Sequence, residues 1–521
     1  CYYSCTDYLC LPIVTEAFYR RSHDGIGERI SIMNVITIMS DEHSWSAMGC
    51  SGSPLVKTPN LDRLAAMSVN FKNAYTTCPL CAPARASWFT GQYVNRIGTW
   101  DNSTPYDGTV RGMSQFLNEQ RIPTCHFGKT HFHSEGEYEF AQLEMPGYLS
   151  TPDLGCYYRE EKIGRINAEK RFEKIGIKEG PDHDDEVTGL AVAWLKKNGT
   201  KTEPWNLNIG YLDPHFPFYV KQENWDYYEK LVTDLPAGVL EPYTSLNEPL
   251  SCLRAYFKGE TATPEMIRRV LIGYYAAVAA LDERIGILLD TLEELDLLKN
   301  TAVIYTSDHG EQMGYHGLWW KCCMFEQSVH IPMMIYHPLI TPKEVKSPVT
   351  LVDLYPTVCE MMGIPKPEHI DGESLYRLMK EGRDGEKKDF AFSEYHAHGM
   401  PCGMFMIRWD NYKYVHYTGY SPQLFDLEAD PEENCDLAAR SDSDSGIRLL
   451  LKEGERRLLS VCDPKEADAR AKAFQKRMKA ALGVGAGYTL ERGTWVPHPE
   501  HVKEVPAYCR QTGRNGGNYG K

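Results

Sequence analysis

The 521-residue chain lacks a hydrophobic run long enough to cross a membrane. A transmembrane helix needs about 20 consecutive apolar residues, and the longest apolar stretch, at residues 271–281, is shorter and fits a buried helix. Residues 1–32 also lack the basic segment and long apolar segment that together mark a secretory signal. We therefore expect no membrane partner, and we expect residues 1–32 to be an artefactual or disordered extension.

The chain is also short of positive charge. Its 56 Lys and Arg residues stand against 71 Asp and Glu residues, which gives a formal net charge of -15. A nucleic-acid partner would require a basic face that displaces counterions, so we expect none. A small anionic substrate is compatible with this charge only where a local cluster of cations overcomes the repulsion of the whole molecule.

Regular cysteine spacing is absent as well. The 16 cysteines follow no disulfide framework, which is typical of reduced thiols and predicts a cytoplasmic protein. Cys78 and Cys81 form a C-x-x-C pair, but a structural zinc needs four ligands and no second pair lies at a suitable spacing. A redox site would leave Pro83 and Arg85 without a role. A redox or metal-binding protein using Cys78 and Cys81 remains an alternative of a different class.

Short β-rich runs alternate with helix-length amphipathic segments along most of the chain. This alternation predicts an α/β fold with a mostly parallel central sheet flanked by helices. Three of the expected strands, at residues 34–39, 205–212 and 301–307, end at polar side chains. Because the carboxyl ends of such strands line the crevice where open α/β sheets bind ligands, we expect these side chains to meet at one site. In chain order they are Asp41, Glu42, His215, Asp308 and His309.

The pattern of apolar and turn residues changes after about residue 385. Four short β-like runs separated by turn residues predict a smaller antiparallel sheet. We therefore expect an extension at 1–32, a catalytic domain at 33–384, a C-terminal antiparallel subdomain at 385–440, and a helical and extended tail at 441–521.

The residues CAPAR, from Cys81 to Arg85, resemble the signature of the sulfatase family, in which the cysteine is oxidised after translation to formylglycine. The surrounding blocks FGKTHF, DPHFPF and TSDHGEQMGYHGLWWK follow in the family's order, and the resemblance covers most of residues 33–435. It implies the alkaline phosphatase fold and a sulfuric ester hydrolase, which cleaves a sulfate monoester into an alcohol and inorganic sulfate.

The resemblance also implies a divalent cation beside the formylglycine made from Cys81. Calcium is the preferred ion, with magnesium and manganese as alternatives, because the implied ligands are mostly hard oxygen donors. Asp41, Asp308 and His309 would hold the ion together with residue 81. Glu42 is an additional candidate ligand, at a position where many relatives carry an aspartate.

Basic side chains have further roles under the same resemblance. Arg85 would orient the formylglycine, and Lys129 and Lys321 would neutralise the sulfate oxygens as charge develops. His215 would protonate the leaving alcohol, and His131 would take the proton from the remaining hydroxyl of the hydrated aldehyde, so that sulfate is expelled and the aldehyde returns.

Several blocks look closest to choline sulfatases and phosphonate monoester hydrolases, and Asn102 stands at a position that contacts substrate in such enzymes. Binding of a quaternary ammonium needs an aromatic box, yet no tryptophan lies between Trp100 and Trp194, so a carbohydrate or aryl sulfate is at least as well supported as choline sulfate. A phosphonate monoester or phosphodiester hydrolase is the alternative. Expected protein partners are a formylglycine-generating or anaerobic sulfatase-maturating enzyme and a second copy in a homo-oligomer.

Overall fold

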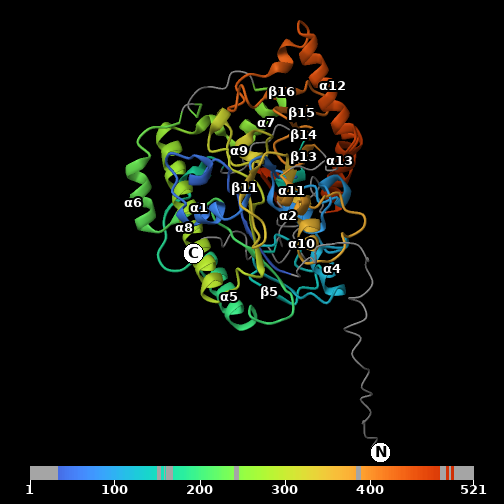
Figure 1. The fold of residues 1–521 in the computed structure, drawn as a ribbon. Coiled ribbons are helices and arrows are strands. Elements are labelled where there is room, and N and C mark those ends of the chain that lie inside the picture. The colour runs from blue at the N-terminus through green and yellow to red at the C-terminus, as the bar shows by residue number, and fades with distance from the viewer. Residues whose placement is uncertain are drawn as a thin grey trace, which may run out of the picture.

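The computed structural model describes residues 33–148, 154–157, 159, 168–236, 238–239, 246–382, 389–481, 488–491 and 494–497. Its centre is an eight-stranded sheet with the order β11-β2-β10-β9-β1-β7-β4-β5 (Figure 1). The strands are β1 (Asn34–Ser40), β2 (Val69–Phe71), β4 (Thr124–Gly128), β5 (Gln142–Glu144), β7 (Asn206–Gly210), β9 (Thr301–Ser307), β10 (Met333–Tyr336) and β11 (Lys343–Val345).

The direction of the strands confirms the predicted sheet. β10 runs antiparallel to both of its neighbours, β9 and β2. All other pairs in this sheet are parallel. Every residue of β1 and of β9 is buried, as expected for parallel strands covered on both faces.

Helices cover the two faces of the sheet (Figure 1). Ile36 and Ile38 of β1 pack with α1 (Pro59–Ala66), α5 (His183–Asn198) and α8 (Pro264–Glu294). Val35 and Met39 point to the opposite face, since side chains alternate along a strand. They pack there with α2 (Cys81–Thr90), α4 (Met113–Glu119) and α10 (Leu354–Met361).

The longest helix, α8, has a clear start signal in the sequence. Thr263 caps it by accepting the backbone N–H of Met266, and Pro264 occupies the first turn, where a proline needs no hydrogen-bond donor. The other helices of this part are α3 (Val94–Ile97), α6 (Gln222–Leu231), α7 (Glu248–Phe257), α9 (Glu326–Val329) and α11 (Tyr376–Glu381). Short strand pairs are β3 (Ala74–Tyr75) with β12 (Val349–Thr350), and β6 (Ile175–Ile177) with β8 (Phe218–Val220).

A four-stranded antiparallel sheet follows in the chain, as predicted. Its strands are β13 (Phe390–Tyr395), β14 (Met404–Trp409), β15 (Tyr412–Tyr417) and β16 (Gln423–Asp426). α12 (Ser445–Leu459) packs on this sheet, α13 (Pro464–Ala481) follows it, and β17 (Tyr488–Glu491) pairs with β18 (Thr494–Pro497). The exact domain boundaries stay predictions, and the predicted extension at 1–32 lies outside the described residues. Within the described part of the chain, no helix combines the length and apolar character that a bilayer crossing demands.

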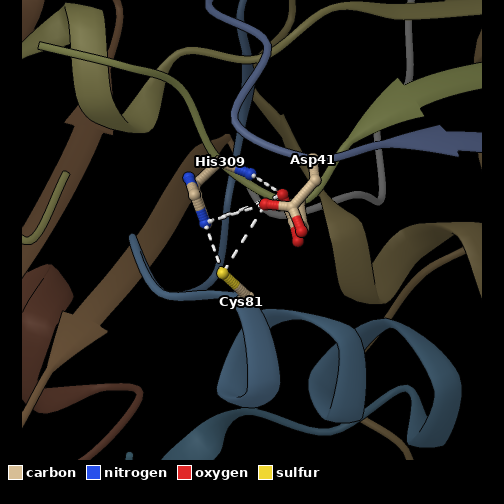
Figure 2. Close-up of side chains that lie close together, drawn as sticks. Asp41, Cys81 and His309 are labelled. Carbon is tan, nitrogen blue, oxygen red and sulfur yellow. Dashed lines mark hydrogen bonds and ion pairs between the residues drawn. The ribbon is translucent and has the colours of Figure 1, made fainter. Parts of the chain in front are cut away.

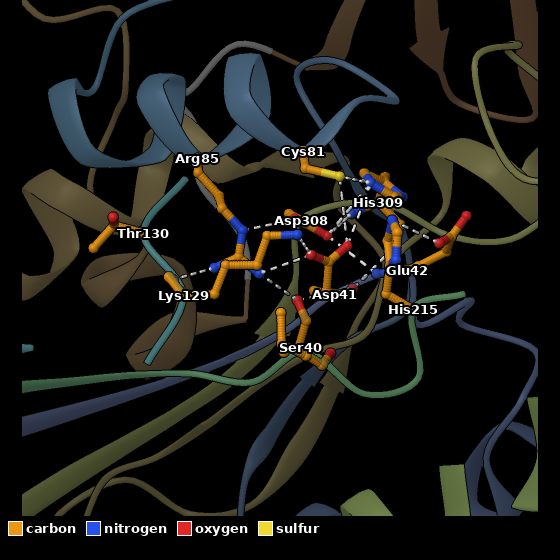
Figure 3. A network of polar contacts seen from close by, with 12 residues as sticks. Ser40, Asp41, Glu42, Cys81, Arg85, Lys129, Thr130, His215, Asp308 and His309 are labelled. Carbon is orange, nitrogen blue, oxygen red and sulfur yellow. Dashed lines mark hydrogen bonds and ion pairs between the residues drawn. The ribbon is translucent and has the colours of Figure 1, made fainter. Parts of the chain in front are cut away.

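Four neighbouring strands, β9, β1, β7 and β4, end at the same edge of the sheet. The register pairs Ser40 with Ser307, Met39 with Gly210, and Gly128 with Gly210. The segments that leave this edge carry Asp41, Lys129, His215 and Asp308. The fold therefore gathers these polar side chains at one place, where the amino end of α2 also lies (Figure 3).

Candidate active site

Cys81 is the first residue of α2, and its sulfur faces the ends of β1 and β9 (Figure 2). The Sγ atom lies 3.1 Å from His309 Nε2 and 3.6 Å from Asp41 Oδ1. All three side chains are buried. Cys81 is present as the thiol, so its sulfur stands where an oxygen of formylglycine would lie after oxidation.

Four potential ligand atoms gather around this sulfur. One atom each of Asp41, Cys81, Asp308 and His309 lies within 4.8 Å of the others. His309 Nδ1 faces the carbonyl of Gly310 at 3.0 Å. Because a carbonyl only accepts, Nδ1 carries the proton and the lone pair of Nε2 points toward the group. Two carboxylates, one imidazole and an oxygen at residue 81 fit a divalent cation.

Arg85 and Lys129 lie on one side of Asp41 (Figure 3). Arg85 follows Cys81 by one helical turn, so both side chains lie on the same face of α2. Its Nε donates to Asp308 Oδ2 at 2.7 Å and its Nη1 to the Lys129 carbonyl at 2.7 Å, while Lys129 Nζ pairs with Asp41 Oδ2. Burial raises the pKa of Asp41, but Lys129 and the neighbouring cations outweigh burial and hold it well below 3.8.

Glu42 and His215 lie on the other side of Asp41 (Figure 3). Glu42 Oε2 is 3.0 Å from Lys321 Nζ and 3.2 Å from His215 Nε2. Burial acts to raise the pKa of Glu42, whereas Lys321 and His215 lower it to about 2. Glu42 is absent from the ligand group around Cys81, although its carboxylate approaches Asp41 and His215 within 4.8 Å.

His131 and Asn102 occupy separate positions near the nucleophile. His131 Nδ1 is buried and has no hydrogen-bond partner within the described ranges. Burial, and then the charge of Lys129, lower the pKa of His131 well below 6.5, which keeps the imidazole neutral. Asn102 Oδ1 accepts the backbone N–H of Ala82 at 3.0 Å and thereby caps the first turn of α2 beside Cys81.

The arrangement of Cys78 argues against a redox pair. Cys78 and Cys81 are both free thiols. Burial raises the pKa of the Cys78 thiol well above 9.0, whereas the first cysteine of a C-x-x-C redox pair, which attacks as a thiolate, requires a lowered pKa.

One buried acid near the site was not predicted from the sequence. Glu311 Oε1 accepts the backbone N–H groups of Met313 and Trp320, each at 2.8 Å, and so shapes the loop that carries Lys321. Burial beside Glu42 raises the pKa of Glu311 well above 4.5. Its position in the SDHGEQ block, three residues after Asp308, was the available signal.

Comparisons with known proteins agree with this geometry. The sulfatase family model matches residues 33–364, which is more than half of the chain. The chain belongs to the sulfatase family. A second model, for the C-terminal part of N-sulphoglucosamine sulphohydrolase, matches residues 314–457. This sulfatase is therefore a member of the alkaline phosphatase superfamily and a sulfuric ester hydrolase.

Curated relatives match over most of the chain. An arylsulfatase K from Canis lupus familiaris is 30% identical over 501 residues, covering 91% of this chain and 91% of the relative. A choline-sulfatase from Rhizobium meliloti (strain 1021) is 31% identical over 428 residues, covering 78% and 82%. Among solved structures, the phosphonate monoester hydrolase of Agrobacterium radiobacter aligns with a TM-score of 0.66 and 22% identity, covering 89% of this sulfatase and 99% of that chain, which supports the fold.

Proposed function

We propose that this sulfatase hydrolyses a sulfate monoester to an alcohol and inorganic sulfate, using a formylglycine made from Cys81 and a divalent cation. The observation that carries the proposal is the position of Cys81 Sγ, at the amino end of α2 and among the ligand atoms of Asp41, Asp308 and His309. Calcium is the preferred ion, because two of the three other ligands are carboxylates.

Formylglycine and the cation together supply an acidified hydroxyl as nucleophile. Arg85 orients the site through Asp308 and the Lys129 carbonyl. Lys129 and Lys321 offset the charge that develops on the sulfate oxygens.

Two histidines move the protons in this proposal. His215 donates a proton from Nε2 to the leaving alcohol as the sulfur–oxygen bond breaks. His131 would then accept, at its buried Nδ1, the proton of the remaining hydroxyl of residue 81, so that the carbon–oxygen bond to sulfate breaks, sulfate leaves and the aldehyde is restored.

The substrate class rests on resemblance and on the relatives. Relatives of this sulfatase include an arylsulfatase K and a choline-sulfatase. We propose an aryl or carbohydrate sulfate as the substrate. The partner that converts Cys81 to formylglycine would be a formylglycine-generating or an anaerobic sulfatase-maturating enzyme. The cytoplasmic location and the homo-oligomer stay predictions.

Paired substrates test the reaction. The protein is coexpressed with a maturing enzyme, loaded with calcium, and assayed on para-nitrophenyl sulfate and on the para-nitrophenyl ester of phenylphosphonate. We expect the larger kcat/KM on the sulfate ester. Faster turnover of the phosphonate would instead assign a phosphonate monoester hydrolase, and turnover of neither ester by protein with converted Cys81 would contradict both.

A further inference from the structure

Glu42, His215 and Lys321 form a compact triangle beside the candidate cation site. Lys321 Nζ is 2.7 Å from His215 Nε2, and Glu42 Oε2 is 3.0 Å from Lys321 Nζ and 3.2 Å from His215 Nε2. The Glu42 side chain is fully buried, that of Lys321 is 8% exposed, and that of His215 is 24% exposed. His215 is therefore the most exposed member of the triangle.

The backbone of Glu42 is fixed by two other elements. Its N–H donates to Asp308 Oδ1 at 3.2 Å, and its carbonyl accepts the hydroxyl of Tyr274, on α8, at 2.9 Å. Its φ of 68° is left-handed, which is uncommon for a residue with a side chain. With Glu42 in this conformation, the neighbouring side chains point to different partners: Asp41 faces Cys81 and Glu42 faces Lys321.

Hydrogen bonding determines which nitrogen of His215 faces the reaction. His215 Nδ1 contacts the carbonyl of Phe216, and a carbonyl only accepts, so Nδ1 carries a proton. Nε2 is then the nitrogen that exchanges a proton with a substrate. Lys321 has only donors, so at 2.7 Å it donates to the lone pair of Nε2 in this structure. Once Nε2 gains a proton, Glu42 is the member of the triangle that can accept a hydrogen bond from it.

A second cation between Asp41, Glu42 and His215 fits this geometry poorly. These three residues bring ligand atoms within 4.8 Å of one another. However, Lys321 Nζ already lies within 3.0 Å of both Glu42 Oε2 and His215 Nε2. A metal ion sharing those two atoms would be repelled by the adjacent ammonium group.

We propose that Glu42 is a positioning residue that holds Lys321 and His215 together for protonation of the leaving group, and that it is not a cation ligand. This inference rests on the proposed function. The inference adds detail to that function, because it gives the two acidic residues after β1 different roles. Asp41 binds the cation, and Glu42 positions His215, which protonates the leaving alcohol. The role matters most for substrates whose alcohol is a poor leaving group, since these depend most on proton donation.

The test compares Glu42→Gln with the parent on two esters and in one binding assay. We expect kcat/KM to fall by at least about tenfold more on an alkyl sulfate than on para-nitrophenyl sulfate, whose phenolate leaves without a proton. We expect the same shift in melting temperature on calcium addition in both proteins. The substitution Glu344→Gln, which removes an exposed carboxylate paired with Lys72, is the matched control and should leave the ratio of the two esters unchanged.

Loss of the calcium-induced shift in Glu42→Gln would overturn the proposal and make Glu42 a ligand. An equal fall on both esters would also overturn it. If Glu42→Gln does not fold, Glu42→Asp keeps the charge but retracts it from Lys321, and the same pattern at smaller amplitude is expected. If the parent protein cleaves phosphonates and not sulfates, the proposed function fails, while the calcium shift and the same pair of leaving groups on phosphonate esters still decide the role of Glu42.

Discussion

The active site and the contact between α9 and the four-stranded sheet both bury charge, but they balance it differently. At the contact, which we call the junction cluster and which comprises Glu326, Arg408, Lys413 and Glu433, the charges face one another. Lys413 Nζ lies 2.9 Å from Glu326 Oε1 and 2.5 Å from Glu433 Oε1. Arg408 Nε donates to the hydroxyl of Tyr75, which in turn donates to Glu326.

In the site cluster, which comprises Asp41, Cys81, Asp308 and His309, the ligand atoms converge on the nucleophile position. Burying an ion costs several kcal/mol unless a partner compensates it. At the junction the protein supplies all of the partners, whereas at the site Arg85 and Lys129 pair with Asp308 and Asp41 and the converging ligand atoms also suit a cation. We therefore expect changes at the junction to act on stability, and changes at the site to act on turnover and on ligand-dependent stability.

The largest expected effect separates chemistry from stability. Cys81→Ala removes the nucleophile, so kcat should fall by about 10⁴-fold or more, while the free energy of unfolding changes by about 1 kcal/mol or less. Steady-state kinetics and chemical denaturation measure the two quantities. Cys78→Ala is the control, because it removes a buried thiol three residues away and should keep activity; its inactivation would revive the redox pair.

Breaking the junction should produce the converse result. Lys413→Met leaves the buried carboxylate of Glu433 and the partly buried carboxylate of Glu326 without their shared cation, so the free energy of unfolding should fall by about 3–5 kcal/mol. The folded protein should keep its kcat at low temperature. Lys299→Met removes an exposed lysine paired with exposed Asp296 and should cost about 1 kcal/mol or less. Similar losses in the two variants would show that the junction contributes no more than a surface pair.

Stabilisation by calcium should depend on the site cluster and not on the junction cluster. Calcium at 100 times its Kd should stabilise the protein by about 2.7 kcal/mol. His309→Ala should lose most of this gain, because the variant lacks one of the ligand atoms. Lys413→Met should keep the gain despite its lower stability. Thermal unfolding with and without calcium measures it, and a gain retained by His309→Ala would place the ion elsewhere.

The pH dependence of stability should report the junction. Burial raises the pKa of Glu433 to about 7, against the opposing effect of Lys413. The pKa of Glu433 in the folded protein exceeds its unfolded value of 4.5. The contribution of Glu433 to the free energy of unfolding is therefore complete below about pH 4.5 and is lost as the pH rises through about 7. Parent protein should therefore lose stability relative to Glu433→Gln over that range. Parallel curves from denaturant titrations would contradict this assignment.

Much of the fold was predictable because buried parallel strands leave a strong signal. The runs that became β1 and β9 are mostly apolar, and the longer run around β7 alternates asparagine with apolar residues; all three are followed by polar residues, and their alignment in one sheet follows from the parallel register. The reversed direction of β10 was not predicted, since the four residues MMIY carry no signal for direction. The strand β4 before Lys129 was also missed, because TCHFG mixes polar and apolar residues.

The sequence indicated which residues come together at the site better than it indicated their contacts. The position of Asp41 follows from the end of β1, but the left-handed φ of Glu42 leaves no mark in the sequence, so its pairing with Lys321 could not be foreseen. Asn102 was expected to contact substrate, and its contact with the Ala82 N–H depends on a loop that only the folded chain brings to α2.

Peptide mass spectrometry across residues 76–91 tests the central claim most directly. After coexpression with a maturing enzyme, the account predicts that residue 81 has lost its sulfur and become an aldehyde that reacts with a hydrazide reagent, and that sulfatase activity rises in proportion to the converted fraction. A fully active preparation in which Cys81 is an intact thiol, or is bonded to Cys78, would contradict it.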